Sequence, residues 1–247
     1  MNPASAGMGH ADIHMHTSAS DGVPTVRELL NHVATQTNLD VIAITDHDRV
    51  DAALWACEHQ DEYPFDIVPG TEVSSAAGHI LGLWITQPIP ARLSLAETIA
   101  AIHEQGGLAI LAHPFHVHMG IVARNVWRYI YRPEVLLESK LDAIEAHNAG
   151  IVLPGANVLA HRLARRLGMA TTGSSDAHTL GGIGSGRTRF PGHTALDLRR
   201  AIVQAQTLVE GTAWPLIDYW TYSRSSTHNR SSEFLAEKLP SNHPTQP

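Results

Sequence analysis

Six short apolar segments, each carrying His, Asp or Glu at or near its end, most constrain the fold of this chain. They are Ile13-His14-Met15-His16, Ile44-Thr45-Asp46-His47, Gly70-Thr71-Glu72, Gly78-His79-Ile80-Leu81-Gly82, Leu111-Ala112-His113-Pro114 and Ser175-Asp176-Ala177-His178. Apolar, β-branched segments are typical of buried parallel strands. Polar side chains at the carboxyl ends of successive strands are typical of the active site of an α/β barrel.

Helical patterns alternate with these segments, which favours βαβ units and a parallel sheet. Apolar residues between positions 26 and 33 follow the i, i+3, i+4, i+7 spacing of one buried helix face. Ser94 with Glu97 forms the capping-box pattern that begins a helix. Thr194 with Asp197 begins a further helix in the same way. The whole pattern predicts the α/β class.

Composition limits the functions that this chain can have. Its 247 residues can bury one large core, and single α/β barrels of this length are common. A formal net charge of −7, with no basic stripe, counts against a nucleic-acid partner. The single cysteine, Cys57, excludes an internal disulfide and a thiolate metal cluster. With no apolar run long enough to span a membrane and no signal-peptide pattern over residues 1–10, we expect a cytoplasmic protein with no membrane partner.

The 17 histidines are the unusual feature of the composition. Histidine is the commonest metal ligand in proteins. A mixture of imidazoles and carboxylates without thiolates suits zinc, manganese or iron(II). The histidines at the strand ends therefore indicate a metal site with nitrogen and oxygen ligands.

Taken together and in order, the motifs resemble those of the PHP family, whose name stands for polymerase and histidinol phosphatase. The residues that carry the resemblance are Asp12-Ile13-His14-Met15-His16-Thr17 with Ser20-Asp21-Gly22, Ile44-Thr45-Asp46-His47-Asp48, Gly70-Thr71-Glu72, Gly78-His79-Ile80-Leu81-Gly82, Ala112-His113-Pro114 and Gly173-Ser174-Ser175-Asp176-Ala177-His178. The resemblance extends from about residue 11 to residue 212. It implies a distorted (β/α)7 barrel with two to three divalent metal ions (Mn, Zn or Fe) at the carboxyl-terminal ends of the strands.

The resemblance also implies three groups of metal ligands. They are His14, His16 and Asp176 for the first metal, Glu72 as a bridge to a second metal that His79 and His113 complete, and Asp21, His47 and His178 for the third. Strand geometry agrees with this grouping, because residues two apart in a strand point to the same face. A carboxylate suits the bridging position, since each of its two oxygens can bind one cation.

Some of these positions have a second interpretation. Asp21 lies in a Ser-Asp-Gly sequence that also occurs in structural turns, and some family members have His there. His79 precedes an apolar strand, where a histidine can instead bond to buried backbone. Asp12 and Asp46 are either hydrogen-bond acceptors for the ligands or ordinary strand-end residues.

Substrate contacts are expected from the loops that follow the strands. The candidate substrate-binding residues are Arg187, Arg124, His116, His118 and Asn148. Arg187 and Arg124 are candidate phosphate clamps, because guanidinium groups match phosphate oxygens in a bidentate fork; solvated surface charge is the alternative. His147 and Asn148 end another apparent strand, where they either line the pocket or satisfy buried backbone groups.

The resemblance favours a stand-alone phosphoesterase. It predicts hydrolysis of a small phosphorylated molecule by attack of metal-bound hydroxide on phosphorus. The candidate substrates are a nucleotide such as a 3′,5′-bisphosphate or cyclic phosphate, and a sugar or histidinol phosphate. The candidate catalytic residues are His178, Asp176, Glu72 and His147, with His178, His147 or a metal-bound water as the proton donor to the leaving group.

Two other functions are compatible with the sequence. A 3′–5′ exonuclease or oligonucleotide nuclease would use the same metals, although the acidic charge balance counts against it. A non-catalytic, metal-stabilised regulatory module is the other alternative, but such a module should have lost ligands, and every expected position carries one. We predict a flexible segment over residues 1–10, one phosphoesterase domain over 11–220, and a disordered tail over 221–247.

Overall fold

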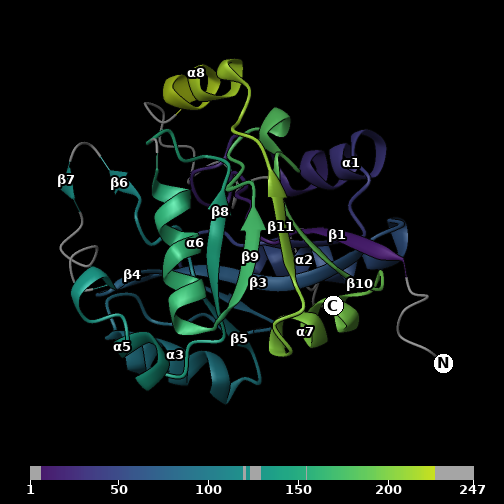
Figure 1. The fold of residues 1–247 in the computed structure, drawn as a ribbon. Helices are drawn as coiled ribbons and strands as arrows, with labels where there is room; N and C mark the ends of the chain where they lie inside the picture. The colour runs from purple at the N-terminus through teal and green to yellow at the C-terminus, as the bar shows by residue number, and fades with distance from the viewer. Residues whose placement is uncertain (1–6, 119–120, 123–128, 154, 226–247) are drawn as a thin grey trace, which may run out of the picture.

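One curved sheet forms the framework of the molecule (Figure 1). The computed structural model describes residues 7–118, 121–122, 129–153 and 155–225. Within these residues the sheet has nine strands in the order β11-β10-β1-β2-β3-β4-β5-β8-β9. The strands are β1 (Met8–Asp12), β2 (Val41–Ile44), β3 (Asp66–Ser75), β4 (Gly78–Leu83), β5 (Leu108–Leu111), β8 (Ala143–Asn148), β9 (Ala170–Ser174), β10 (Gly186–Pro191) and β11 (Leu208–Gly211).

The sheet curls until its two ends meet. Thr188 on β10 links to β9, because its Oγ1 accepts from the backbone N–H of Gly173 at 2.9 Å and donates to the Gly173 carbonyl oxygen at 2.8 Å. The hydroxyl of Thr207, just before β11, donates to the carbonyl oxygen of Thr171 at 2.6 Å. These bonds satisfy polar groups at the seam, and the result is a nearly closed barrel.

The direction of the strands confirms the predicted α/β barrel and corrects one detail. β4 is antiparallel to β3 and β5, and β10 is antiparallel to β1 and β11. The other seven of the nine described strands run in one direction. The reversal of β4 follows from a tight hairpin, in which Gly78 adopts a φ of 110° that other residues rarely take.

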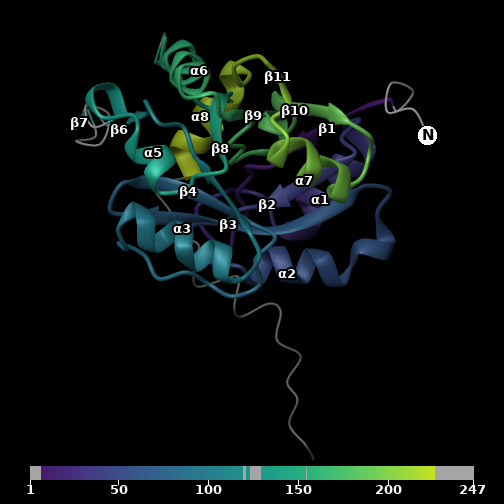
Figure 2. The same ribbon diagram turned by 60° about the horizontal axis from the view of Figure 1, so that its bottom comes forward.

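Helices pack around the sheet. They are α1 (Val26–Gln36), α2 (Asp51–Glu58), α3 (Leu95–Glu104), α5 (Val135–Glu138), α6 (Ala156–Leu167), α7 (Ala195–Val203) and α8 (Leu216–Ser225), with 3₁₀ turns at Gln60–Glu62 and Leu180–Gly182. Figure 2 shows α2 and α3 beneath β3. A small separate hairpin consists of β6 (Val117–His118) and β7 (Ile121–Val122). Among the described helices, each falls short of the length and apolar character needed to cross a bilayer.

Local sequence signals explain where several helices begin. The predicted capping boxes are present: Ser94 with Glu97 at α3, and Thr194 with Asp197 at α7. Such caps contribute about 1 kcal/mol each, because they satisfy backbone N–H groups at the helix start. The apolar positions predicted between residues 26 and 33 form the buried face of α1.

The core closes the barrel below the polar end. Its interior is filled by aliphatic side chains that include Val41, Leu81 and Ile110, all 5% exposed or less. Each such buried side chain contributes about 1.5–3 kcal/mol to folding. Buried charged and imidazole side chains, among them His14, Glu72 and Asp176, lie instead toward the carboxyl ends of the strands.

Two predicted boundaries differ from the structure. β1 begins at Met8 and pairs with β10, so residues 8–10 belong to the sheet and not to a flexible segment. α8 continues to Ser225, so residues 221–225 are helical and not part of a disordered tail. Residues 1–6 and 226–247 lie outside the described residues.

Candidate metal centre

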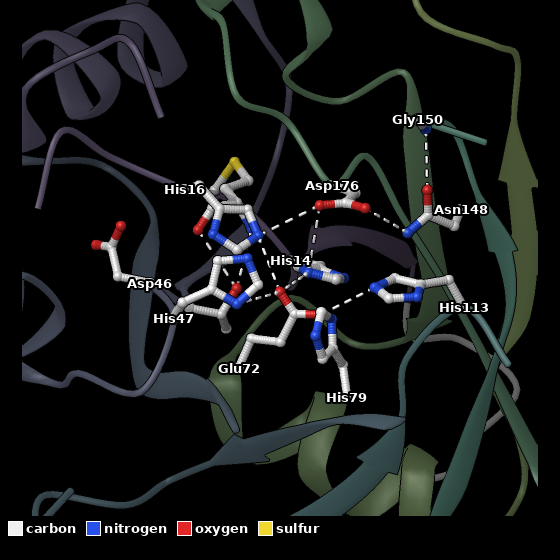
Figure 3. Close-up of polar contacts among 12 residues, drawn as sticks. His14, His16, Asp46, His47, Glu72, His79, His113, Asn148, Gly150 and Asp176 are labelled. Carbon is white, nitrogen blue, oxygen red and sulfur yellow. Dashed lines mark hydrogen bonds and ion pairs between the residues drawn. The ribbon is translucent and has the colours of Figure 1, made fainter. Parts of the chain in front are cut away.

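Glu72, on β3, lies at the centre of a group of five histidines (Figure 3). Its Oε1 atom is 2.7 Å from His79 Nδ1 and 2.9 Å from His113 Nε2. Its Oε2 atom faces three further nitrogens: His14 Nε2 at 3.1 Å, His16 Nε2 at 3.2 Å and His47 Nδ1 at 3.3 Å. The two oxygens of one buried carboxylate therefore face two different sets of imidazoles, as a bridging ligand requires.

Asp176, after β9, faces the same histidines from the opposite side. Its Oδ1 atom is 3.2 Å from His16 Nε2 and 3.4 Å from His14 Nε2. Asp176 has a φ of 55° and His113 a φ of 26°, in the left-handed region that non-glycine residues rarely adopt. Backbone of this kind costs of order 1–3 kcal/mol and is concentrated at functional sites.

Asp21 brings a third group of ligands together at the edge of the cluster. Its Oδ2 atom is 3.2 Å from His178 Nε2 and 3.8 Å from His47 Nε2. Its Oδ1 atom is 3.7 Å from His16 Nδ1. The structure thus places Asp21 within the cluster and His79 beside Glu72. Neither residue is remote from the other predicted ligands.

The described residues of the cluster fit divalent cations. Three overlapping groups have ligand atoms within 4.8 Å of one another: His14, His16, Glu72 and Asp176; His16, Asp21, His47 and His178; and His47, Glu72 and His79. Buried ring nitrogens of His14, His16 and His79 lie close to carboxylate oxygens, yet they find no hydrogen bond of acceptable geometry among the described residues. Buried polar atoms are nearly always hydrogen-bonded, so nitrogens that converge in this way indicate a site for metal.

The charges of the cluster are strongly coupled. Burial disfavours a charged His16, but Asp176 and Glu72 raise the pKa of His16 to about 10. Burial also opposes ionisation of Glu72, yet His14, His79 and His47 hold the pKa of Glu72 well below its ordinary value. Burial lowers the pKa of His47 to about 4 despite the nearby Glu72 carboxylate. Without metal, the ionised Glu72 therefore lies beside a protonated His16 and a neutral His47 at neutral pH.

We expect metal affinity to rise with pH, because a cation must displace a proton from His16 at any pH below about 10. For each proton that is released on binding, the metal affinity should rise by about tenfold per pH unit. Calorimetric titration with Mn²⁺ at one pH, in two buffers of different ionisation enthalpy, measures this release. A binding heat that is the same in both buffers would contradict the prediction.

Glu145, on β8, is a buried member of the site that sequence reasoning missed. Its Oε1 atom accepts from His14 Nδ1 at 2.9 Å, and its Oε2 atom accepts from the backbone N–H of His113 at 2.8 Å. The first bond directs His14 Nε2 toward Glu72, as carboxylates commonly orient metal-binding histidines. The available signal was a carboxylate between the apolar residues Ile144 and Ala146 of the strand.

Neither Asn148 nor His147 lines the cavity, and Asn148 fills the second role left open for it, because its Oδ1 accepts from the backbone N–H of Gly150 at 3.0 Å. Asn148 is buried, and its Nδ2 donates to Glu145 Oε2 and Asp176 Oδ2, both at 3.0 Å. It therefore holds the two carboxylates in place. His147 lies outside the cavity lining, with its Nδ1 3.4 Å from Asn157 Nδ2. The structure therefore corrects the predicted catalytic role of His147. A register shift between Glu145 and His147 turns the Asn148 side chain inward and the His147 side chain outward.

Among the described residues, Asp12 and Asp46 accept hydrogen bonds from the residues that flank the ligands and not from the ligand imidazoles themselves. Asp12 accepts from the backbone N–H of Ser175 at 3.0 Å and of Gly184 at 2.8 Å. Asp46 accepts from the backbone N–H of Thr17 at 2.8 Å and from its hydroxyl at 2.7 Å. Both carboxylates therefore fix loops that carry ligands. Burial raises the pKa of Asp12 to about 6.

A cavity of about 890 Å³ opens above the cluster. Its floor includes Glu72 and Asp176, and its walls include His116 and an aromatic group made of Tyr129, Trp214, Tyr219 and Tyr222. His116 therefore lies where a substrate contact was predicted. His118 belongs to β6, and Arg124 lies outside the described residues.

Arg187 does not line this cavity, which corrects its predicted role as a phosphate clamp. Its guanidinium donates to Asn38 Oδ1 at 3.0 Å, and its Nε lies 3.9 Å from Glu210. Asn38 precedes the amino end of β2, at the opposite end of the barrel from the cluster. Position in a strand, and not proximity in sequence to His178, decides where this side chain points.

The strand ends of this barrel bring histidines and carboxylates together in overlapping groups that can bind cations. The fold and the site therefore define the class of metal-binding α/β barrels. A family model described as PHP-associated matches residues 154–207. An uncharacterized protein of Methanocaldococcus jannaschii is 37% identical over 116 residues, 42% of this chain and 67% of that protein. The chain belongs to the PHP family.

Further similarities concern fold and parts of the chain. A two-domain protein of Bacteroides vulgatus, containing a predicted PHP-like metal-dependent phosphoesterase, has a TM-score of 0.66 at 18% identity, covering 84% of this chain and 66% of that chain. The 5′-3′ exoribonuclease Rnm of Salmonella typhimurium is 38% identical over 86 residues, 32% of this chain and 29% of the exoribonuclease. The first similarity supports the barrel fold, and the second covers less than a third of either protein.

Proposed function

We propose that this chain is a metal-dependent phosphoesterase that hydrolyses a small phosphorylated molecule in the cavity above Glu72. The observation that carries this proposal is the Glu72 carboxylate, whose two oxygens face separate sets of imidazoles at 2.7–3.3 Å. Two cations held on either side of one carboxylate form the usual arrangement for hydrolysis of phosphate esters. A substrate bound in the cavity would lie directly above them.

The residues that would hold the metals are the nine predicted ligands, His14, His16, Asp21, His47, Glu72, His79, His113, Asp176 and His178. Two to three divalent ions, of manganese, zinc or iron, suit this set. Bound there, such ions supply Lewis acidity, which neutralises charge on the phosphoryl oxygens and lowers the pKa of water.

The chain's own residues then orient the ligands and the substrate. Once neutral, His14 donates through Nδ1 to Glu145, which directs its Nε2 lone pair into the cluster. His178 donates through Nδ1 to the Asp176 carbonyl oxygen at 2.8 Å, which directs its Nε2 toward Asp21. Both ligands are thus fixed before a substrate arrives, so little reorganisation is needed during the reaction.

The size and charge of the protein favour a small substrate. A cavity of about 890 Å³ falls in the range of sites for small molecules. The net charge of −7 opposes the binding of an extended polyanion. We therefore favour a nucleotide or another small phosphate ester, with phosphate release as the reaction.

A nuclease is the second candidate, supported by one specific observation. The aromatic group on the cavity wall could stack against bases, as single-strand-binding proteins do. The partial similarity to an exoribonuclease points in the same direction. The direction of cleavage would be decided by experiment, since the alternative considered from the sequence was a 3′–5′ exonuclease and the relative is a 5′–3′ enzyme.

Phosphate and product release by Mn²⁺-loaded protein should be measured on a panel of substrates. The panel contains an aryl phosphate, AMP, adenosine 3′,5′-bisphosphate, a cyclic nucleotide, histidinol phosphate, and short RNA and DNA single strands. We expect turnover of one small ester, lost in His14→Ala and retained in His161→Ala, which removes an exposed histidine on α6. Cleavage of the single strands alone would replace the proposal by the nuclease, and inactivity on the whole panel with metal bound would contradict both.

A further inference from the structure

The segment from Trp214 to the end of α8 is fixed to the loops that carry the ligands. Trp214 Nε1 donates to the carbonyl oxygen of Ser175 at 2.6 Å. The hydroxyl of Thr179 donates to Asp218 Oδ1 at 2.6 Å, and that carboxylate is buried. The hydroxyl of Tyr219 donates to the Ala149 carbonyl oxygen at 3.0 Å. Figure 1 shows α8 beyond the carboxyl ends of β8 and β9, so these bonds hold it over the polar end of the barrel.

Tyr222, on the last turns of this helix, contacts two of the predicted ligands. Its hydroxyl donates to Asp21 Oδ2 at 3.0 Å. Its ring centroid lies 4.4 Å from that of His178, whose ring also stacks on His16 at 4.2 Å. The His178 ring is therefore held between the rings of His16 and Tyr222.

Asp21 is the ligand that most needs such support. Its side chain is 42% exposed, against 28% for His47 and 8% for His178 in the same group. An exposed carboxylate on a loop loses rotamer freedom when it binds a cation, which weakens binding. A donor that already holds one oxygen reduces that loss, and Ser20 makes only a longer contact, at 3.4 Å, with the other oxygen.

We propose that Tyr222 is a positioning residue for the third cation, acting through Asp21 and His178. The proposal rests on the metal centre proposed above and adds α8 to it as a necessary part. According to this proposal, cation binding depends on α8, which lies beyond residues 154–207, the segment that the PHP-associated family model matches. The ligand group concerned is His16, Asp21, His47 and His178. The hydroxyl orients the carboxylate, and the ring fixes the imidazole.

The test is a Mn²⁺ titration of the full chain, with unbound Mn²⁺ counted by electron paramagnetic resonance. Tyr222→Phe keeps the ring and removes the hydroxyl, so a role in packing alone leaves binding unchanged. Tyr63→Phe is the matched control, because it removes a phenol hydroxyl that lies 3.4 Å from Asn31 on the outer helices. We expect the weakest Mn²⁺ site to lose about tenfold to a hundredfold in affinity in Tyr222→Phe and to be unchanged in Tyr63→Phe.

A double-variant cycle tests the route through Asp21. Tyr222→Phe should add no further loss to Asp21→Asn, because the carboxylate that the hydroxyl orients is already changed. Additive losses, or equal binding by the wild-type chain and Tyr222→Phe, would overturn the proposal alone. No Mn²⁺ binding by the wild-type chain would overturn the metal centre together with it.

Discussion

Glu72→Gln is expected to abolish phosphate release and to remove most of the bound metal while the fold persists. The substitution keeps the shape of the side chain, but its amide offers only one acceptor oxygen to the two sets of imidazoles that Glu72 faces. Metal catalysis supplies several kcal/mol, so we expect a loss of about 10³-fold or more in kcat/KM. The measurement is kcat/KM on the best substrate of the panel, with metal content per chain determined on the same sample.

The matched control is Glu62→Gln, which neutralises an exposed glutamate paired with Arg27 at 3.2 Å. Its activity and metal content should equal those of the wild-type chain. Circular dichroism of both variants shows whether the barrel is retained. Wild-type turnover by Glu72→Gln would contradict the assignment of Glu72 as the bridging ligand.

Metal should also stabilise the fold by a large amount. The cluster buries Glu72 and Asp176 among five or more imidazoles, and a cation that binds only the folded state stabilises it by mass action. At about 100 times Kd this contribution is about 2.7 kcal/mol. For a chain of this size each kcal/mol raises Tm by about 2–4 °C, so we expect a rise of about 5–10 °C.

Thermal unfolding followed by circular dichroism, in chelator and then in excess Mn²⁺, measures this shift. Chelated protein should also lose phosphate release and regain it when Mn²⁺ is restored. Glu72→Gln serves as the control, since its Tm should be nearly independent of Mn²⁺. A wild-type Tm that does not change between the two conditions would show that the cluster binds no cation.

The predicted ligands were readable from sequence because each lies within a short motif at a strand end. Parallel strands bring such ends to one place, and the resemblance to the PHP family implied that His14, Glu72 and Asp176 share one cluster. The structure brings these residues together within hydrogen-bonding distances. Local sequence therefore carries most of the information about this centre.

The supporting residues were harder to predict, for physical reasons. A β-bulge in β8 breaks the alternation that strand patterns rely on, so the directions of His147 and Asn148 could not be predicted from the sequence. Tyr222 lies in a polar segment that resembles a tail by composition, and only its contacts with Asp21 reveal it as part of the site. Arg187 alternates with the buried residues of β10, so its side chain contacts Asn38 and Glu210 and does not line the cavity.

The most direct test of the metal centre is an anomalous difference map from crystals of the wild-type chain soaked in Mn²⁺. Our account predicts one peak on each side of the Glu72 carboxylate, the first near His14 and His16 and the second near His79. A third peak is predicted beside Asp21, near His178. Absence of any peak within ligand distance of Glu72, in crystals that bind Mn²⁺ elsewhere, would contradict the account.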